Sequence, residues 1–212
     1  MKLYYIIFFL TFIASHNSYS SEKRFKVHTL AFYNLENLFD TINDTSKRDE
    51  ASPIMEMKYN RSEVYNKKIK NLSKVISGIG FEETKTLPTI VGLCEVENKN
   101  VVEDLINSDL LKNANYGISH FDSPDERGID VALIYRKNMF KNLNENSAYL
   151  ELKYASGKIN YTRDQLVVEG VLENEKIYII VNHWPSRSGG ELGSRPYRNK
   201  ACLLYTSDAA DE

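Results

Sequence analysis

Hydrophobic and polar positions along the chain predict strand, helix, strand and helix, followed by a run of strands. Residues 27–35 are rich in β-branched and aromatic side chains, and residues 89–96 are almost wholly apolar, as in a strand buried on both faces. The polar residues 40–60 show no period and are expected to form a loop. Further strands are predicted at 116–121, 129–136, 147–153, 165–172 and 176–182. This order favours a mixed sheet with helices outside it, followed by antiparallel pairing.

Two segments carry apolar residues at helical spacing. The first begins at Arg61, stops at Gly78 and Gly80, and has an apolar face made of Tyr65, Ile69, Leu72, Ile76 and Ile79. Its other faces carry lysines, which are interpreted as solvated: Lys67, Lys70 and Lys74. The second helix can be capped by Asn98 or Asn100 and buries Val101, Val102, Leu105, Ile106 and Leu110.

The two ends of the chain differ from its middle. Residues 1–20 contain one Lys, a short apolar run and small residues at Ser18 and Ser20, which predicts an export signal peptide cleaved after Ser20. The alternatives are an uncleaved membrane anchor and a buried helix, but the run is shorter than the roughly 20 residues that span a bilayer. Residues 202–212 complete no element, and a non-native tail is favoured over a short acidic native one.

Length and charge narrow the possible functions. A chain of 212 residues suffices for one domain with its own core. The net charge of -2 argues against binding nucleic acid through bulk electrostatics, so an anionic substrate would need a local group of cations. Such a group is expected in the Ser/Gly-rich segment that carries Arg187, Arg195, Arg198 and Lys200. The two cysteines indicate neither a zinc site nor a disulfide framework.

Polar residues interrupt the predicted strands near their ends, where apolar ones are expected. Glu95 ends a buried strand, where a carboxylate is costly unless a cation meets it, so it is a candidate ligand for a hard divalent metal. A structural salt bridge is the alternative. Asn34 closes the first strand as a second candidate, or as a simple strand-end cap.

Three later segments offer groups that suit a phosphate. Arg127 lies in the charged turn before the strand at 129–136, and Asp130 is the second residue of that strand. Arg163 precedes the strand at 165–172, and Asn182, His183 and Arg187 come at or after the end of the last strand. A guanidinium matches phosphate geometry, and an Asn-His pair can hydrogen-bond a phosphoryl oxygen. The alternatives are ordinary Arg–Asp pairs and a core histidine satisfied by the backbone.

These segments, in this order, resemble the endonuclease/exonuclease/phosphatase superfamily. The resemblance is carried over residues 25–201 by Phe-Tyr-Asn-Leu-Glu-Asn-Leu-Phe-Asp, Cys-Glu-Val-Glu-Asn, Arg-Gly-Ile-Asp-Val-Ala-Leu-Ile-Tyr and Asn-His-Trp-Pro-Ser-Arg. It implies an α/β four-layer sandwich of two mixed β-sheets flanked by helices, here truncated at its C-terminus. It also implies a divalent metal, Mg²⁺ first, with Mn²⁺ or Ca²⁺ as alternatives.

The resemblance assigns roles residue by residue. Glu95 matches the principal metal ligand, and Asn34 helps to place metal and phosphate. Arg163 is similar to a phosphate-contacting Arg, with Arg127 and Arg187 as further substrate contacts. His183, beside Asn182, matches the histidine on the scissile phosphate, and Asp130 would hold it in orientation. The Cys94 before Glu95 departs from the Gln that many members carry.

The family's later Asp-x-Asn and Asp-His segments, which align and activate water, are not in this sequence, so the chain itself is expected to be inactive. For the parent protein we expect a secreted or periplasmic endonuclease with DNA or RNA as its partner. Stable membrane insertion is not expected, and nothing indicates an oligomer. The alternatives are an exported phosphatase, a sphingomyelinase-like lipid phosphodiesterase, and a non-catalytic binding module with the same fold. Basic and aromatic residues along a groove would favour the nuclease, and the candidates are Tyr154, Tyr161, Arg163 and Arg187.

Overall fold

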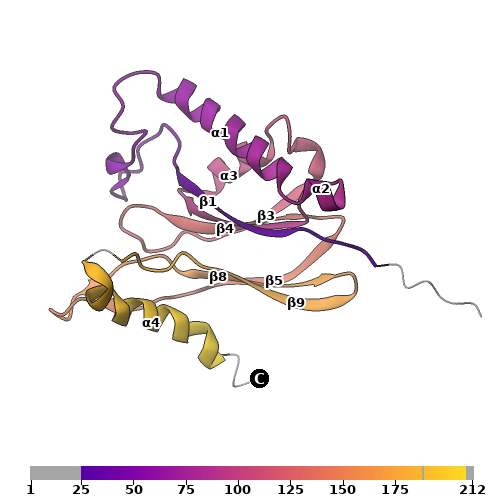
Figure 1. The fold of residues 1–212 in the computed structure, drawn as a ribbon. Coiled ribbons are helices and arrows are strands. Elements are labelled where there is room, and N and C mark those ends of the chain that lie inside the picture. Colours follow the sequence, from indigo (N-terminus) through magenta and orange to yellow (C-terminus); the bar gives the residue numbers. More distant parts are fainter. Residues whose placement is uncertain (1–24, 188, 209–212) are drawn as a thin grey trace, which may run out of the picture.

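The computed structural model describes residues 25–187 and 189–208, which are arranged in four layers. Helices, a four-stranded sheet, a three-stranded sheet and a last helix follow one another across the molecule (Figure 1). The predicted α/β sandwich is therefore confirmed. The predicted signal peptide at 1–20 and residues 209–212 of the predicted tail lie outside the described residues. In the described part, no helix has the length and apolarity needed to cross a membrane.

The first sheet is mixed, as predicted. Its strand order is β1-β2-β4-β3, with bounds β1 Leu30–Leu38, β2 Ile90–Val96, β4 Asp130–Arg136 and β3 Tyr116–His120. β1 and β2 run parallel, whereas β4 pairs antiparallel with both β2 and β3. β2 lies in the interior of the sheet and is apolar except for Glu95, so the C-terminal end of β2, with Glu95, lies between β1 and β4.

The second sheet is antiparallel throughout, whereas a mixed sheet was predicted. Its order is β5-β8-β9, with bounds β5 Phe140–Ala148, β8 Gln165–Leu172 and β9 Glu175–Val181. β8 turns into β9 through Glu173 and Asn174, which have φ of 49° and 71°. Two positive φ values in a two-residue connection make the turn that joins antiparallel strands. A small hairpin of β6 (Leu152–Lys153) and β7 (Ile159–Asn160) precedes β8.

β5 was predicted at 147–153 and lies mostly before that range. Its residues include Lys141, Asn142, Asn144 and Asn146, a composition that does not predict a strand. β5 is an edge strand that pairs only with β8, and polar side chains are typical of such edges. Phe140, which is 1% exposed, anchors it in the core.

The helices on the first sheet follow the predicted pattern, except that Leu110, predicted to be buried, lies beyond the end of the second helix and is 49% exposed. α1 (Arg61–Gly78) and α3 (Lys99–Ile106) cover its outer face, with the short α2 (Phe81–Thr84) beside them (Figure 1). Of the two possible caps of α3, Asn98 is the one used, since its Oδ1 accepts the Val101 N–H at 3.1 Å. Two short 3-10 turns complete the set, η1 (Asp49–Ala51) and η2 (Lys112–Ala114).

α4 (Gly190–Asp208) occupies a segment that was expected to be a loop. Ala201 is fully buried against Leu150 and Leu152, and its carbonyl accepts a hydrogen bond from Gln165 Nε2 at 2.6 Å. Packing on the second sheet therefore outweighs the low helix propensity of the Gly and Ser residues and of Pro196 inside the helix. α4 continues across position 201, and the non-native origin of 202–212 stays a prediction.

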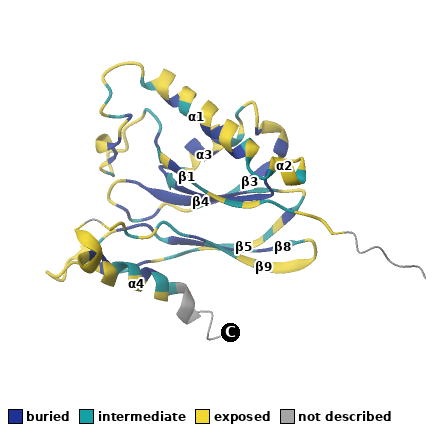
Figure 2. Ribbon diagram, viewed as in Figure 1, coloured by how far each residue is buried: buried dark blue, intermediate teal, exposed yellow. Residues whose placement is uncertain are grey.

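Two layers of apolar residues hold the sandwich together. One fills the space between α1, α3 and the first sheet, and the other lies between the two sheets (Figure 2). β2 contributes to both, because Val91 and Leu93 face the helices while Ile90 and Cys94 face the second sheet. The polar groups at the C-terminal end of β2 are thus fixed by a rigid, fully packed strand.

Candidate metal and phosphate site

Glu95 lies where β2 departs from regular pairing. Its φ is 61°, and the register between β2 and β4 shifts between Cys94 and Val96. A left-handed glutamate costs on the order of 1–3 kcal/mol and is maintained only when its surroundings enforce it, often at a functional site. Burial raises the pKa of the neighbouring Cys94 thiol to about 12, and the negative charge of Glu95 raises it further, so that sulfur stays neutral.

The end of β1 provides the groups that hold the Glu95 carboxylate. Asn34 Nδ2 donates to Glu95 Oε1 and the Asn37 N–H donates to Oε2, both at 2.9 Å. Glu36 and Asn37 also have positive φ, 53° and 59°, and the register of β1 against β2 shifts there. Lys68 of α1 donates to the carbonyls of both Glu36 and Asn37 and so stabilises this irregular segment.

His183 follows β9 and faces Glu95 from the second sheet. Its Nε2 lies 3.5 Å from Glu95 Oε1. Its Nδ1 and the neighbouring Asn182 Oδ1 are buried atoms with no hydrogen-bond partner among the described residues. Burial lowers the pKa of His183, the positive charge of Arg163 lowers it further, and Glu95 opposes the shift. The imidazole is therefore neutral at pH 7 and can donate from one nitrogen while it accepts at the other.

Arg163 fixes the segment that carries His183. Its Nε and Nη2 donate to the His183 carbonyl at 3.3 and 3.1 Å, Nη2 donates to the Trp184 carbonyl at 3.1 Å, and Nη1 pairs with Asp125 Oδ2 at 3.2 Å. Four of the five guanidinium N–H groups are thereby engaged, and the side chain is 8% exposed. Its predicted contact with phosphate stays a prediction and would rest on the remaining N–H.

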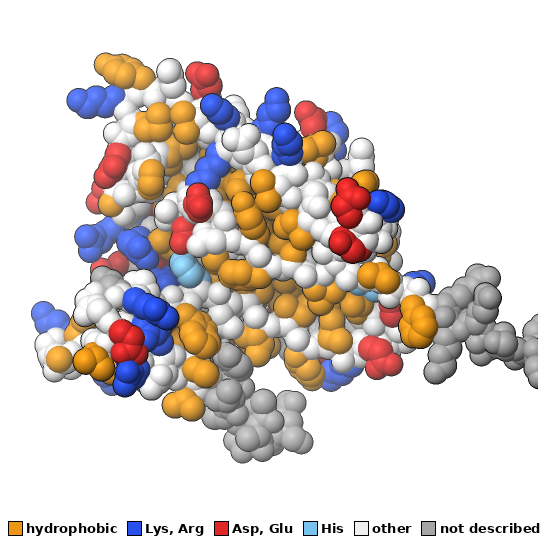
Figure 3. All heavy atoms as spheres, in the orientation of Figure 1, with side chains coloured by type: hydrophobic (Ala, Val, Ile, Leu, Met, Phe, Trp, Pro, Cys, Tyr) orange, Lys and Arg blue, Asp and Glu red, His pale blue; other side chains and the backbone are white. Residues whose placement is uncertain are grey.

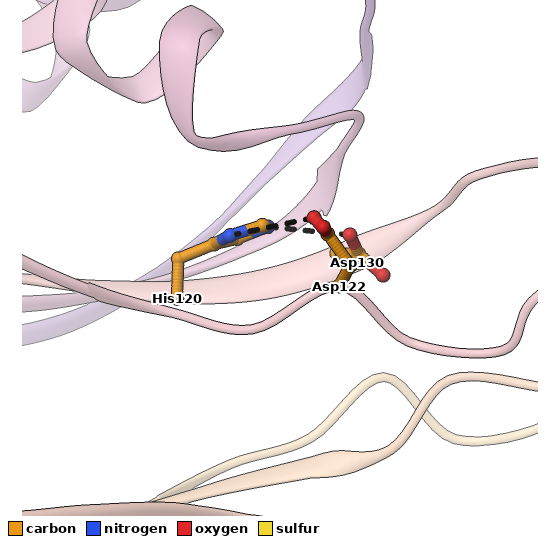
Figure 4. Close-up of side chains that lie close together, drawn as sticks. All are labelled: His120, Asp122 and Asp130. Atoms are coloured by element: carbon orange, nitrogen blue, oxygen red, sulfur yellow. Dashed lines mark ion pairs between the residues drawn. The ribbon is translucent and has the colours of Figure 1, made fainter. Parts of the chain in front are cut away.

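Asp130 does not make the predicted contact with His183. The Ser123 N–H donates to its Oδ1 at 2.9 Å, and its Oδ2 lies 3.2 Å from His120 Nε2 (Figure 4). The cause is the alternation of β4: Ala132 and Ile134 belong to the layer under the helices, and Asp130 shares their face. His183 lies at the end of the other sheet, so the prediction that Asp130 orients it is wrong.

A groove of about 420 Å³ is lined in part by Arg163, which contacts the His183 carbonyl, and it combines basic and aromatic side chains. Tyr154, Tyr161 and Arg163, three of the four residues expected to line such a groove, are brought together there. Arg127 joins them, with its Nε 3.5 Å from Asp125 Oδ1 and its side chain 54% exposed. Two further lining residues, Arg48 and Tyr197, were not singled out by the sequence pattern.

The expected group of cations after β9 is weaker than the sequence suggested. Arg195 and Arg198 lie on α4, where both pair with Glu191, at 2.8 and 3.4 Å. Arg187 is exposed in the segment before α4 and does not line the groove. On the face seen in Figure 3, Lys and Arg side chains alternate with Asp and Glu, consistent with the small net charge.

Comparison with known proteins now gives the family. The model of the endonuclease/exonuclease/phosphatase family matches residues 29–212. The chain belongs to this family. Its members are metal-dependent hydrolases, among them nucleases and phosphatases. No curated protein matches the chain well enough to count as a relative.

Solved structures share the fold of this family member at low sequence identity. A conserved protein of unknown function from Enterococcus faecalis V583 is 14% identical with a TM-score of 0.51, covering 86% of this chain and 60% of that one. An endonuclease/exonuclease/phosphatase from Bacteroides vulgatus is 16% identical with a TM-score of 0.50, covering 84% and 57%. TDP2 from D. rerio, solved with a single-strand DNA product, is 16% identical with a TM-score of 0.45, covering 66% and 49%. The chain spans about half the length of the TDP2 structures it matches.

The residues around Glu95 fit one hard divalent cation. Each carboxylate oxygen accepts one hydrogen bond and keeps a lone pair, and the carboxylate and amide oxygens nearby are the donors that Mg²⁺ prefers. Asn34 Oδ1 already accepts the Glu36 N–H at 2.7 Å, so Asn34 contributes mainly by orienting Glu95. Its predicted role as a direct ligand stays a prediction.

Sequence reasoning missed three groups of this site. Asp125 anchors Arg163 and Arg127, Lys68 supports the irregular end of β1, and the Asn37 N–H holds Glu95. Asp125 could have been suspected from its place in the charged turn before β4. Asn37 acts through its backbone N–H, and Lys68 donates to backbone carbonyls. Any residue type can make or accept such contacts, so the sequence does not indicate them.

Proposed function

We propose that this family member carries the metal-binding and phosphate-binding half of a phosphodiester hydrolysis site with nucleic acid as substrate. The observation that supports it most is the joint placement of Glu95 and His183. Strands of two different sheets bring them within 3.5 Å, at the point where the backbone of β1 and of β2 is irregular. Mg²⁺ is the proposed metal. It would supply the positive charge that offsets the developing charge on the phosphoryl oxygens.

The chain's own residues would bind and orient the phosphate. Glu95 would hold the metal, while Asn34 and the Asn37 N–H fix the direction of its carboxylate. Neutral His183 would donate a hydrogen bond to a phosphoryl oxygen, and Asn182 would offer its unpaired Oδ1 beside it. In other enzymes one such donor is worth roughly 3–4 kcal/mol of barrier lowering. Arg163 would keep His183 in place through the backbone.

The groove favours a nucleic acid over a lipid or a sugar phosphate. Tyr154 and Tyr161 line it and are each about half exposed, and Arg127 adds a positive charge whose effect reaches His183. Aromatic faces stack on bases and guanidinium groups contact phosphates, which is how single strands are bound without sequence preference. Arg187 would contact the strand outside the groove.

The ends and the histidines of the chain bear on where the protein acts and on what it lacks. The parent protein would be an exported endonuclease, secreted or periplasmic, on the strength of residues 1–20. Of the four histidines in the sequence, His183 is the one that the described residues place beside Glu95, whereas His28 contacts Thr89 and Glu173, and His120 contacts Asp130. We therefore propose that this chain binds metal and phosphate but needs a general base from elsewhere in the parent protein.

Binding and cleavage test separate parts of the proposal. Fluorescence anisotropy of a labelled single-stranded oligonucleotide measures binding by this chain in the presence of Mg²⁺. Tyr161→Ala should raise the Kd about tenfold, within the range for loss of one stacked base. Lys85→Ala serves as the control, because Lys85 pairs with Glu82 at the end of α2 and does not line the groove.

Cleavage is measured with the parent protein on supercoiled plasmid, with Mg²⁺ or with EDTA. Glu95→Gln should abolish nicking, while Glu82→Gln, the same change at an exposed glutamate of α2 outside the groove, should leave it nearly unchanged. Intact plasmid together with hydrolysis of bis(p-nitrophenyl) phosphate would show that the substrate is not nucleic acid. Full nicking by Glu95→Gln would overturn the proposed site.

A further inference from the structure

A second group of carboxylates surrounds a cavity of about 180 Å³ on the helix side of the first sheet. They come from three separate segments: the loop before α1, the end of β2, and the connection from β3 into β4. The carboxylates that line the cavity are Asp44, Asp49, Glu97, Asp122 and Asp130. The cavity exceeds the roughly 30 Å³ that one liquid water occupies, so it has room for an ion with water.

The cavity contains a buried carboxylate oxygen that nothing in the described chain satisfies. Asp49 is 1% exposed, and its Oδ2 accepts the Asp44 N–H at 2.8 Å. Its Oδ1 has no hydrogen-bond partner among the described residues. A buried, unpaired carboxylate oxygen is strongly disfavoured, which points to a positively charged ligand that completes it.

His120, Asp122 and Asp130 add a second set of ligand atoms at the same place. Their ligand atoms all lie within 4.8 Å of one another, and Figure 4 shows both carboxylates beside one edge of the imidazole. The His120 side chain is 3% exposed, and the position of its Nε2 relative to Asp130 Oδ2 does not make a hydrogen bond despite the distance of 3.2 Å.

Lys47 is the one cationic residue among those lining the cavity, and its charge is directed elsewhere. Its Nζ donates to the carbonyls of Ser123 at 2.7 Å and Asp125 at 3.2 Å. One ammonium group held by two backbone carbonyls does not neutralise five carboxylates. The excess negative charge is therefore available to a divalent cation.

This cavity is distinct from the site at Glu95. Glu97 and Asp130 face the layer under the helices, whereas Glu95 meets His183 at the edge between the two sheets. We propose that the cavity is a structural Ca²⁺ site that ties the loop before α1 to the β3–β4 connection. Oxygen donors from three separate segments suit Ca²⁺, which takes six to eight oxygens in adaptable geometry. Zn²⁺ favours nitrogen and sulfur donors, and His120 is the only such residue in this set.

Thermal unfolding of the full chain, titrated with CaCl2, tests the proposal. All proteins carry Glu95→Gln, so that a cation at the other site contributes nothing. At a hundredfold excess over the Kd, Ca²⁺ should raise the Tm by roughly 5–10 °C. Isothermal titration should give one Ca²⁺ per chain.

Two variants and one control locate the ion. Asp49→Asn should abolish the Tm rise, and Asp122→Asn should reduce it; Asp122 is 82% exposed, so that variant folds even if Asp49→Asn does not. Asp109→Asn removes the same charge from a surface pair with Lys112 and should keep the full rise. The proposal would be overturned if Ca²⁺ did not raise the Tm of the chain that carries Glu95→Gln alone, or if adding Asp122→Asn to that chain left the rise unchanged. A rise with Zn²⁺ or Mg²⁺ but not with Ca²⁺ would overturn the assignment of the ion.

Discussion

Replacement of Arg163 by methionine tests whether this arginine holds the His183 segment or serves only as a phosphate contact. The variant leaves Asp125, which is 3% exposed, as a buried charge without its partner. Loss of one member of a buried ion pair costs about 3–5 kcal/mol. The carbonyls of His183 and Trp184 lose their donors as well, but they lie near the surface and water can replace part of that loss.

Urea unfolding, followed by the fluorescence of the single tryptophan, Trp184, measures this cost where it arises. With an m-value of roughly 2 kcal/mol per M for a chain of this size, a loss of about 4 kcal/mol lowers the midpoint by about 2 M urea. Arg127→Met is the matched control. Arg127 is 54% exposed and lies 3.5 Å from the same carboxylate, so its loss should cost about 1 kcal/mol or less.

A double-mutant cycle with Asp125→Asn completes the experiment. Because the double variant leaves neither charge buried alone, its cost should fall short of the sum of the single costs by at least about 1 kcal/mol. If Arg163→Met costs no more stability than Arg127→Met, the positioning role is refuted. Arg163 would then be a substrate contact alone.

Further predictions concern packing and pH. A Cβ on Gly170 would lie 2.1 Å from Phe140 Cζ, so Gly170→Ala should lower the free energy of unfolding in urea by about 1–3 kcal/mol. Gly193 lies in open space within α4, so Gly193→Ala should raise that free energy by about 0.5–1 kcal/mol. Equal effects of the two variants would contradict the packing of β5 on β8. Burial raises the pKa of Tyr116, whose hydroxyl donates to the Pro88 carbonyl, to about 12. The folded state therefore keeps a proton that the unfolded state releases near pH 10, and stability should fall by about 2–3 kcal/mol from pH 10 through 12. Tyr116→Phe should remove that part of the decline in unfolding free energy, and an unchanged decline would contradict it.

The elements with strong periodicity could be predicted from the sequence. α1, α3, β2 and β4 bury most of the expected apolar residues because packing determines each pattern, and the exception is Leu110, which lies beyond the end of α3. β5 was misplaced because an edge strand tolerates asparagines, and α4 was missed because its burial at Ala201 depends on residues far away in the chain. Both errors arise because tertiary contacts decided these elements, and the local pattern of hydrophobic and polar residues carries no information about such contacts.

The candidate site was predictable in its residue types and less so in its pairings. Glu95, Asn34 and His183 were singled out as polar residues at strand ends, and the structure brings them together. Asp130 was assigned to His183, although the alternation along β4 places it on the face under the helices, together with Ala132 and Ile134. Alternation tells which residues of a strand share a face, but which face the second sheet covers is decided by tertiary packing.

Paramagnetic broadening by Mn²⁺ tests the metal site at Glu95 most directly. NMR spectra of the histidine ring protons are recorded while Mn²⁺ is added to the chain and to its Glu95→Gln variant. The ring resonances of His183 should broaden at low Mn²⁺ in the chain, because its Nε2 lies 3.5 Å from Glu95 Oε1, and should stay sharp in the variant. Those of His28, which contacts Thr89 and Glu173 instead, serve as the internal control. Equal broadening of the His183 resonances in both proteins would contradict a metal bound by Glu95.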